Sequence, residues 1–315
     1  MSTEYLVTGG AGFIGSNIVH SLVDAGKRVR VLDNLSTGRE GNLSDIAGKI
    51  ELVKGDVRDV ETVKKAVAGV RYILHLAALP SVSRSVADPV STNDVNIGGT
   101  LNIMVQARDA GVERVVFSSS SSVYGDLPVL PKREDMMPTP RSPYALSKLT
   151  GEHYGRLFFD LYGLKTFSLR YFNVYGPRQN PKSQYAAVIP KFIEALNAGR
   201  PPTIHGDGGQ TRDFTFVEDV VNANLCCCKA PEKAAGGIFN VGGGRRVSVN
   251  DLAKKMMEIM GKHLDPIHDA PQPGDVRDSQ ADYTRAAELL GWGAKVAFDE
   301  GLRRTIDWFT RHEVV

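Results

Sequence analysis

The feature that most constrains the fold of this chain is a glycine-rich turn at the end of its first apolar run. In "YLVTGGAGFIG", Gly10, Gly12 and Gly15 form a G-x-G-x-x-G pattern. Gly9 directly precedes it. Glycines at this spacing permit a tight turn and let backbone N–H groups approach a pyrophosphate at a helix N-terminus. The next apolar run ends at Asp33, where a carboxylate accepts hydrogen bonds from ribose hydroxyls and repels a 2′-phosphate. Together these features predict a dinucleotide site that prefers NAD to NADP.

Short apolar runs alternate with helical patterns through the first half of the chain. The apolar runs include "RVRVLDN", "IELVKGD", "YILHLAA" and "RVVFSSS", and the helical patterns cover Phe13–Ala25, Val60–Ala68 and Ile97–Ala110. Continuously apolar strands that alternate with helices are typical of a parallel sheet covered on both faces. The sequence therefore predicts an α/β fold of the Rossmann type, with a doubly wound parallel sheet.

The alternation loosens after about Asn173, where loops rich in proline and glycine become frequent. We expect an NAD-binding domain at residues 1–172 and a smaller C-terminal α/β domain, mainly for substrate, at residues 173–315. The later run "GIFNVGG" resembles a strand that returns to the first sheet. A strand and a helix from about 214–242 are therefore assigned to the NAD-binding domain.

Composition excludes several classes of function. The chain has 315 residues, and its 38 basic and 36 acidic residues leave no cationic surplus for nucleic acid. The sequence contains no apolar run of the roughly 18 residues that a membrane helix needs. It begins "MSTEYLVTGG", without a basic leader, which predicts a cytoplasmic protein. The consecutive Cys226, Cys227 and Cys228 point in different directions on a helix, so we expect packing thiols and no metal site.

A second glycine cluster, "NVGGGRRVSVNDLAKKM", lacks the Gly-Lys-Ser/Thr ending of a phosphate loop. Ser248 and Asp251 have the spacing of a helix cap. We therefore interpret this segment as a turn before a capped helix.

The segment "SPYALSKLTGEHY" contains the strongest candidates for chemistry. Tyr144 and Lys148 are four residues apart in a helical stretch and so share a face. They form either an ordinary exposed pair or a tyrosine base, because a nearby ammonium lowers a phenol pKa that is normally about 10. An oxidised nicotinamide would add a second positive charge. The predicted NAD site favours the base.

Five consecutive serines follow the apolar run "VVF" in "VVFSSSSSVYGD". Serine hydroxyls compete with the backbone for hydrogen bonds, so serine is a poor strand former. The segment is either a polar linker or a row of hydroxyls at the end of a strand that faces a ligand.

Eight motifs occur in the order found in the extended short-chain dehydrogenases/reductases, and the resemblance covers essentially the whole chain. They are "TGGAGFIG", "LDNLSTG", "GDVRD", "HLAA", "SSSSSVYGD", "YALSK", "LRYFNVYGPRQ" and "GDGGQTRDF". Within that family the chain most resembles the UDP-hexose 4-epimerases. The segments "PVLPKREDMMPTPRSPYALSK" and "QYAAVIPKFI" look most like the UDP-N-acetylglucosamine 4-epimerases.

The resemblance implies a mechanism for the serines, the tyrosine and the lysine. Tyr144, as phenolate, takes the O4 proton directly or through Ser120 while hydride passes from C4 to NAD. Hydride then returns to the other face of the 4-keto sugar, so NAD stays tightly bound. Lys148 holds the nicotinamide ribose and keeps Tyr144 acidic. Ser121 and Ser122 stand where related dehydratases carry an Asp-Glu pair, which argues against water elimination because serine is no acid at neutral pH.

The resemblance also implies binding residues at further positions. For the cofactor NAD they are Gly9, Gly12, Phe13, Ile14, Gly15, Asp33, Asn34, Ser36, Gly38, Asp56, Val57, Leu76, Ala77, Ala78, Asn96, Ser118, Tyr144, Lys148, Tyr171 and Val174. For a UDP-sugar they are Ser120, Tyr144, Asn173, Ala187, Val188, Thr203, His205, Arg212, Asp275 and Ser279. His205 is equally well read as a surface histidine. Gln272 stands where relatives often carry an arginine, for which Arg277 could compensate.

Two further expectations come from the family. The helices around Ile97–Ala110 and Pro143–Tyr162 pair across a two-fold axis, which predicts a homodimer, with Leu149, Tyr154, Leu157, Phe158 and Leu161 on the paired surface. Ser279 stands at a position that lines the C2 substituent of the sugar. A small residue there leaves room for an N-acetyl group, which predicts turnover of UDP-GlcNAc and UDP-GalNAc, and of UDP-Glc and UDP-Gal.

Three alternatives stay open beside this 4-epimerase. A UDP-glucuronate 4-epimerase is the first, because no residue identifies or excludes a carboxylate-binding group near C6. Another NAD-dependent sugar-nucleotide oxidoreductase or dehydratase is the second. A non-catalytic NAD-sensing regulator is the third, and the intact set of Ser120, Tyr144 and Lys148 argues against it.

Overall fold

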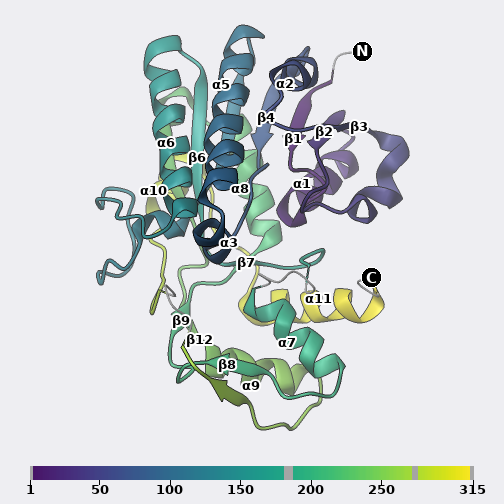
Figure 1. The fold of residues 1–315 in the computed structure, drawn as a ribbon, viewed down its shortest axis with the longest axis vertical. Helices are drawn as coiled ribbons and strands as arrows, with labels where there is room; N and C mark the ends of the chain where they lie inside the picture. Colours follow the sequence, from purple (N-terminus) through teal and green to yellow (C-terminus); the bar gives the residue numbers. More distant parts are fainter. Residues whose placement is uncertain (1–2, 181–186, 272–275, 313–315) are drawn as a thin grey trace.

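The computed structural model describes residues 3–180, 187–271 and 276–312 and is shown in Figure 1. Within these ranges, seven strands form one sheet in the order β11-β6-β5-β4-β1-β2-β3, and every neighbouring pair is parallel. The strands are β1 (Tyr5–Thr8), β2 (Val29–Asp33), β3 (Ile50–Lys54), β4 (Tyr72–His75), β5 (Arg114–Ser120), β6 (Lys165–Tyr171) and β11 (Gly237–Val241). The order 3-2-1-4-5-6 is that of dinucleotide-binding folds, so the predicted Rossmann-type sheet is confirmed.

Helices cover both faces of this sheet because its strands are apolar on both sides (Figure 1). Residues of α1 and α8 form one hydrophobic core with the sheet, and residues of α2, α5 and α6 form the other. These helices are α1 (Phe13–Asp24), α2 (Val60–Val67), α5 (Gly99–Asp109), α6 (Pro143–Tyr162) and α8 (Val217–Lys229). The carboxyl ends of the strands lie toward the C-terminal part of the chain, below the sheet in Figure 1.

Local sequence fixes where α6 begins and how closely it approaches the sheet. The Ser142 hydroxyl accepts a hydrogen bond from the Ala145 N–H at 3.1 Å, and Pro143 occupies the first helical position. A Cβ atom on Gly151 would lie 2.2 Å from the Phe117 ring of β5. Glycine at this position therefore lets α6 pack against the strand that carries the serines.

Two strands end or break beside the site. β5 includes the first three of the five serines, because Ser118, Ser119 and Ser120 pair in register with β6. The run "KTFSLRYFNVYG" is broken after β6, and Val174–Tyr175 forms β7, which pairs with β10 (Thr215–Phe216) in a separate sheet. Asn173 lies at this break with a φ of +27°.

The segment that precedes β11 returns to the large sheet. Helix α8 packs on β5 and β6, and β11 pairs with β6 at the edge of the sheet. Cys226, Cys227 and Cys228 are free thiols on α8, and the last two are buried in the core. The expectation of packing thiols is confirmed, whereas the domain limits stay a prediction.

The C-terminal part has a hydrophobic core of its own, built mainly on α7, α9 and α11. Its elements are α7 (Val188–Asn197), β8 (Thr203–His205), β9 (Thr211–Arg212), β12 (Val247–Ser248), α9 (Val249–Ile259), β13 (Ile267–Asp269) and α11 (Phe298–Arg311). Helix α10 (Thr284–Leu290) instead packs on β11 and α8 of the first domain. The Ser248 hydroxyl accepts a hydrogen bond from the Asp251 N–H at 3.0 Å. The second glycine cluster therefore precedes a capped helix, as predicted.

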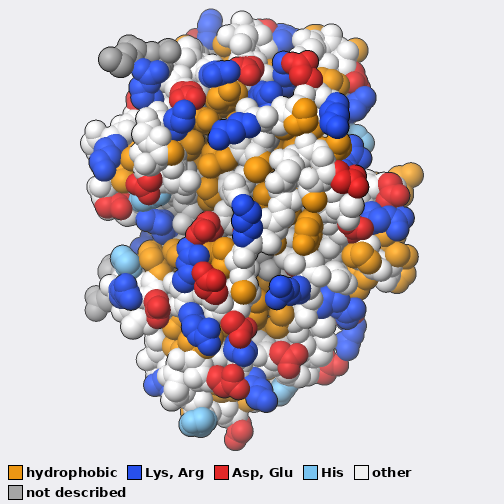
Figure 2. All heavy atoms as spheres, turned by 180° about the vertical axis from the view of Figure 1, so that it is seen from behind, with side chains coloured by type: hydrophobic (Ala, Val, Ile, Leu, Met, Phe, Trp, Pro, Cys, Tyr) orange, Lys and Arg blue, Asp and Glu red, His pale blue; other side chains and the backbone are white. Residues whose placement is uncertain are grey.

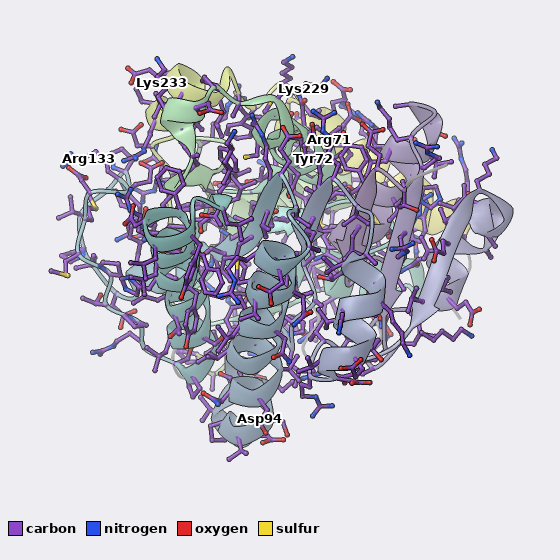
Figure 3. All side chains as sticks on the ribbon, turned by 90° about the horizontal axis from the view of Figure 1, so that it is seen from above. Arg71, Tyr72, Asp94, Arg133, Lys229 and Lys233 are labelled. Carbon is purple, nitrogen blue, oxygen red and sulfur yellow. The ribbon has the colours of Figure 1, made fainter. Side chains whose placement is uncertain are left out.

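The helix predicted at Ile97–Ala110 begins earlier than the sequence pattern indicates. The chain is helical from α4 (Pro89–Asn93) through a π-helical turn, η2 (Asp94–Gly98), into α5. The remaining short elements are α3 (Val82–Ala87), η1 (Glu40–Lys49), η3 (Ser121–Tyr124) and η4 (Glu232–Ala234). In Figure 3, α5 and α6 lie side by side at one edge of the molecule, and Asp94 marks the start of the helical column that leads into α5.

The surface carries both signs of charge. On the face seen in Figure 2, basic and acidic side chains are interspersed, with hydrophobic side chains between them. In the part of the chain that the structure describes, no helix combines the length and apolar character of a membrane span. Within the same residues, no group of three histidine, cysteine or acidic side chains has the arrangement of a metal site.

Candidate active site

A cavity of about 1130 Å³ lies outside the carboxyl ends of the strands, between the sheet and the C-terminal part. This is where ligands bind in open α/β sheets. Most of the sequence-predicted residues lie on its wall. They are Gly9, Gly12, Phe13, Ile14, Gly15, Asp33, Asn34, Ser36, Gly38, Val57, Leu76, Ala77, Ala78, Ser118, Ser120, Tyr144, Lys148, Tyr171, Asn173, Val174, Ala187, Arg212 and Ser279.

The glycine turn leaves room for a phosphate group. Gly9 has a φ of +68°, and a Cβ there would lie 2.7 Å from the Ala77 nitrogen. A Cβ on Gly15 would lie 2.2 Å from the Gly9 oxygen, so both glycines are required by the turn itself. Gly12, by contrast, faces open space apart from the Gly9 oxygen. Its backbone can therefore be approached closely by a ligand at the start of α1.

Asp33 occupies the position expected of a ribose-binding carboxylate. Its side chain is buried and accepts hydrogen bonds from the Ala11 N–H at 2.9 Å and the Leu35 N–H at 2.8 Å. A carboxylate offers about four acceptor sites, so this one retains capacity for ribose hydroxyls. With the glycine turn, Asp33 makes a site that fits NAD.

The serines at the end of β5 divide between two faces because side chains alternate along a strand. The Ser118 carbonyl accepts a hydrogen bond from Lys148 Nζ at 2.6 Å. The Ser119 hydroxyl donates to Glu152 Oε1 at 2.5 Å. The Ser120 hydroxyl hydrogen-bonds to the Tyr144 phenol and accepts from Ser122 Oγ at 2.9 Å. The serine run is therefore an ordered strand end and turn, not a linker.

Tyr144 and Lys148 lie on one face of α6, as predicted, but their electrostatics differ from the expectation. Burial raises the pKa of the Tyr144 phenol, and the hydrogen bond with Ser120 opposes that rise only in part. Burial also lowers the pKa of the Lys148 ammonium to about 8. Lys148 Nζ is directed to the Ser118 carbonyl and lies 5.9 Å from the centre of the Tyr144 ring. In the protein's own groups, burial therefore outweighs the contacts that lower the pKa of the Tyr144 phenol, and the role expected of Lys148 stays a prediction.

A buried ion pair supports this strand end from behind. Glu152 lies one turn after Lys148 on α6 and accepts two hydrogen bonds from Arg170 of β6, at 2.8 Å and 2.7 Å. Each residue is about 1% exposed. The guanidinium also lies over the Tyr124 ring, 4.6 Å from its centre. These contacts join β5, β6 and α6 at the level of Ser119.

Ser279 is fixed at the other end of the cavity by hydrogen bonds through its hydroxyl. Its Oγ accepts from Asn173 Nδ2 at 3.0 Å and from the Asp213 N–H at 3.2 Å. The Asp213 carboxylate is buried and accepts the N–H groups of Gly243, Gly244 and Ala281. Burial nevertheless raises the pKa of Asp213 to about 6. Ser279 thus links two segments of the chain by hydrogen bonds: Asn173 at the break after β6 and Asp213 directly after β9.

Several predicted residues do not line the cavity. The Asp56 carboxylate is turned to Arg58, at 2.8 Å and 2.9 Å, which lowers its pKa, and Asn34 donates to it as well. Asn96 is buried behind the wall, where its amide binds the Leu79 backbone and Ser147 Oγ. Val188, Thr203 and His205 also lie away from the wall. Asp275 and Gln272 fall outside the described residues.

Sequence reasoning missed several polar residues on the wall. The cationic ones are Arg39, Arg84, Lys132 and Arg178, and Gln179, Asn180 and Asp278 lie there too. Arg178 and Gln179 are the last two residues of the quoted motif "LRYFNVYGPRQ", and Asn180 follows it. Lys132 gave no signal, because its side chain is brought back to the cavity by a loop whose backbone pairs with Gln280 and Asp282.

Comparison with known proteins agrees with this geometry. The model of the NAD dependent epimerase/dehydratase family matches residues 5–242. The chain belongs to this family. It is an NAD-dependent enzyme of the epimerase type, and NAD is its cofactor.

The relatives include epimerases of more than one sugar. A UDP-glucose 4-epimerase of Mycolicibacterium smegmatis is 45% identical, over 96% of this chain and 97% of that protein. The structure of the UDP-glucose 4-epimerase of Thermotoga maritima with UDP-glucose has a TM-score of 0.93 and 40% identity, and covers 98% of this chain and 99% of its own. The UDP-N-acetylglucosamine 4-epimerase of Methanobrevibacter ruminantium, in complex with UDP-N-acetylmuramic acid, has a TM-score of 0.94 and 38% identity, with the same coverage.

Proposed function

We propose that this enzyme is a UDP-hexose 4-epimerase that interconverts UDP-GlcNAc and UDP-GalNAc, and also UDP-Glc and UDP-Gal. The observation that carries the proposal is the arrangement of Ser120, Tyr144 and Lys148 around the strand end, beside a site that fits NAD. The relatives named above act on both plain and N-acetylated sugars, which supports a UDP-sugar but does not choose between them.

The residues of the site have separate roles in the proposed reaction. Bound NAD would supply the acceptor for the hydride from C4 and its source on return. Tyr144 removes the proton from the sugar O4, and Ser120 holds both that oxygen and the phenol. Because burial raises the pKa of Tyr144, the phenolate requires cationic support. Lys148, fixed on the Ser118 carbonyl, places an ammonium at the cofactor side of the phenol.

Ser121 and Ser122 favour epimerisation over elimination. Ser122 donates its hydroxyl to Ser120 Oγ and belongs to the turn η3. Loss of water from the sugar needs an acid that protonates the leaving hydroxyl. The serine strand end has no carboxylate in its sequence to supply that proton. A stereochemical exchange at C4 requires no such acid.

The proposal is tested with a panel of nucleotide sugars and no added NAD. We expect UDP-GlcNAc and UDP-Glc each to be converted to a mixture with its C4 epimer, with no net change in free NADH. Turnover of UDP-GlcA alone would assign the enzyme to the UDP-glucuronate 4-epimerases and overturn the proposed substrates. A 4-keto product that accumulates would show an oxidoreductase or dehydratase, and no conversion of any sugar would support a regulatory role.

We further propose that the enzyme is a homodimer joined through α6. Leu157 and Leu161 of the predicted surface are 49% and 67% exposed. Phe158, however, is buried, and Leu149 and Tyr154 are only partly exposed and pack against internal clusters, so these three contribute less to the predicted surface. Exposed apolar side chains on α6 and the adjoining α3 and α4 take their place: Leu146, Tyr162, Val86 and Val90. An apolar surface of this kind is typical of a subunit interface.

A further inference from the structure

Arg178 has a backbone conformation that side chains rarely adopt. Its φ is +70°, in the left-handed region, two residues after Gly176. Residues other than glycine and asparagine are uncommon there, and they cluster at ligand sites where neighbouring contacts hold them. Arg178 also lines the cavity described above.

The contacts that hold Arg178 come from helix α1. Asn17 Nδ2 donates to the Pro177 carbonyl at 3.0 Å and to the Phe13 carbonyl at 2.9 Å. Arg178 Nη1 in turn donates to Asn17 Oδ1 at 3.3 Å. Asn17 therefore ties the loop after β7 to the first turn of the helix that follows the glycine turn. The guanidinium is fixed to the cofactor side of the cavity, although it belongs to the loop that leads toward the C-terminal part.

The guanidinium has more hydrogen-bonding capacity than these contacts use. An arginine carries five N–H donors, and Asn17 is the hydrogen-bond acceptor that the described residues provide. Arg178 is only partly exposed, and burial lowers its pKa. Asp45 and Asp24 attract it from a distance, but the Asp45 carboxylate is bonded to His20 at 3.0 Å. A partly buried cation with free donors beside a glycine turn is suited to an anion with several oxygens.

We infer that Arg178 binds the diphosphate of NAD and is the cation that retains the cofactor in this enzyme. A diphosphate is present in both NAD and a UDP-sugar, so the site must distinguish two ligands of the same chemistry. Arg178 is anchored on α1, next to the glycine turn. Arg212 lies on β9 in the C-terminal part and is held by the carbonyl groups of Thr211 and Arg277. We therefore assign Arg178 to the cofactor and leave Arg212 to the nucleotide sugar.

This assignment depends on NAD binding and not on which sugar is turned over. The test measures NAD directly: the amount bound per chain after purification, and the rate at which bound NAD is lost when the enzyme is diluted into an NAD-degrading glycohydrolase. The affinity for UDP is measured on the same preparations by calorimetry. The variants are Arg178→Met and Arg178→Lys. Arg71→Met is the control, because Arg71 is exposed at the amino end of β4, the end of the sheet opposite the cavity (Figure 3).

We expect Arg178→Met to release NAD about tenfold to a hundredfold faster than the parent, the usual worth of charge-assisted hydrogen bonds. Arg178→Lys keeps the charge but loses the planar fork, so its release should be intermediate. Arg71→Met should behave as the parent, and UDP affinity should stay within about twofold in all three.

Unchanged NAD release in Arg178→Met would overturn the inference. Weakened UDP binding with unchanged NAD release would also overturn it, by assigning Arg178 to the nucleotide-sugar diphosphate. If Arg178→Met does not fold, the lysine variant decides by the same two measurements.

Discussion

Ser119 of β5 donates a 2.5 Å hydrogen bond to Glu152 of α6, on the side of the strand away from its two neighbours. The Ser118 carbonyl accepts a hydrogen bond from Lys148, and the Ser120 hydroxyl hydrogen-bonds to the Tyr144 phenol, so three consecutive serines bind to one helix. Glu152 lies two turns after Tyr144 and one turn after Lys148, and so continues the same helical face. The strand end is thus held in register with the residues that we propose for chemistry.

The first prediction concerns this contact. Glu152→Gln should lower the free energy of unfolding by about 3–5 kcal/mol, because it leaves the buried guanidinium of Arg170 without its charge partner. Ser119→Ala removes one hydrogen bond to a charged group and should cost about 1.5–3 kcal/mol. Urea denaturation at pH 7 measures both. A Glu152→Gln variant within 1 kcal/mol of the parent would show that the pair is not structurally important.

The second prediction concerns the proposed base. Tyr144→Phe should reduce epimerisation by about 10²–10⁴-fold, because the phenol is the group that exchanges the O4 proton. The ring and its packing remain, so NAD should still copurify in the parent's amount. A coupled assay measures turnover, and absorbance after heat release measures NAD. Near-normal turnover in the variant would exclude Tyr144 as the base, and loss of NAD would mean that the substitution damages the cofactor site.

Part of this site followed from the sequence and part did not. The parallel sheet, the glycine turn and Asp33 followed from local patterns, because hydrophobic period and turn chemistry are encoded over short distances. The role of Ser119 did not follow, since five identical residues carry no signal of which ones face a ligand. Which groups each serine side chain faces is determined by the pairing of β5 with β6 and by the packing of α6 on both strands.

Asn96 was predicted from the sequence to bind NAD but does not line the cavity, whereas Arg178 lines the cavity but was not predicted. Asn96 matched a family position, but its amide is fully used by the Leu79 backbone and Ser147, so it supports the wall from behind. Arg178 lies in a quoted motif without having been selected, because nothing in the motif shows that its guanidinium is tied to Asn17, more than 150 residues away. Long-range contacts of this kind are properties of the fold and not of the local sequence.

The third prediction is a pH dependence of stability. His75 is fully buried between Thr8 and Thr100, at 2.7 Å and 3.0 Å, and burial lowers its pKa to about 3. A histidine in the unfolded chain titrates near 6.5. Between these values the unfolded chain binds a proton that the folded chain does not. The stability that neutral His75 provides is therefore fully present above pH 6.5 and is lost as the pH falls toward 3.

His75→Gln isolates this effect. The variant should be less stable than the parent at pH 7.5, and the difference should shrink by about 2 kcal/mol at pH 5. Asp213, whose pKa is raised to about 6, contributes with the opposite sign, since the folded chain then binds the extra proton. That contribution is common to both proteins and cancels in the difference. Urea denaturation at the two pH values gives the result, and a difference that does not change with pH would contradict the assignment.

The fourth prediction concerns the subunit interface. Leu157→Glu together with Leu161→Glu should convert the enzyme from twice 34.2 kDa to a monomer of 34.2 kDa, because two charges would enter the apolar surface of α6. Ile267→Glu is the matched control: Ile267 is 52% exposed but lies on β13 in the C-terminal part. Light scattering at micromolar concentration measures the mass. A parent that is already monomeric would rule out the dimer, and a dimeric double variant would place the interface elsewhere.

The last prediction concerns the choice of sugar and depends on Ser279. If this residue borders the C2 substituent, Ser279→Tyr should fill the space for an N-acetyl group and abolish turnover of UDP-GlcNAc while largely sparing UDP-Glc. The Ser279 hydroxyl also accepts hydrogen bonds from Asn173 and from the Asp213 N–H, so Ser279→Tyr changes these contacts as well as the space beside the sugar. Ser279→Ala loses these bonds without filling the space. It should therefore lower kcat/KM for both sugars to a similar extent, whereas Ser279→Tyr should change their ratio by at least tenfold. Equal losses for the two sugars in both variants would show that Ser279 positions Asn173 and does not select the substituent.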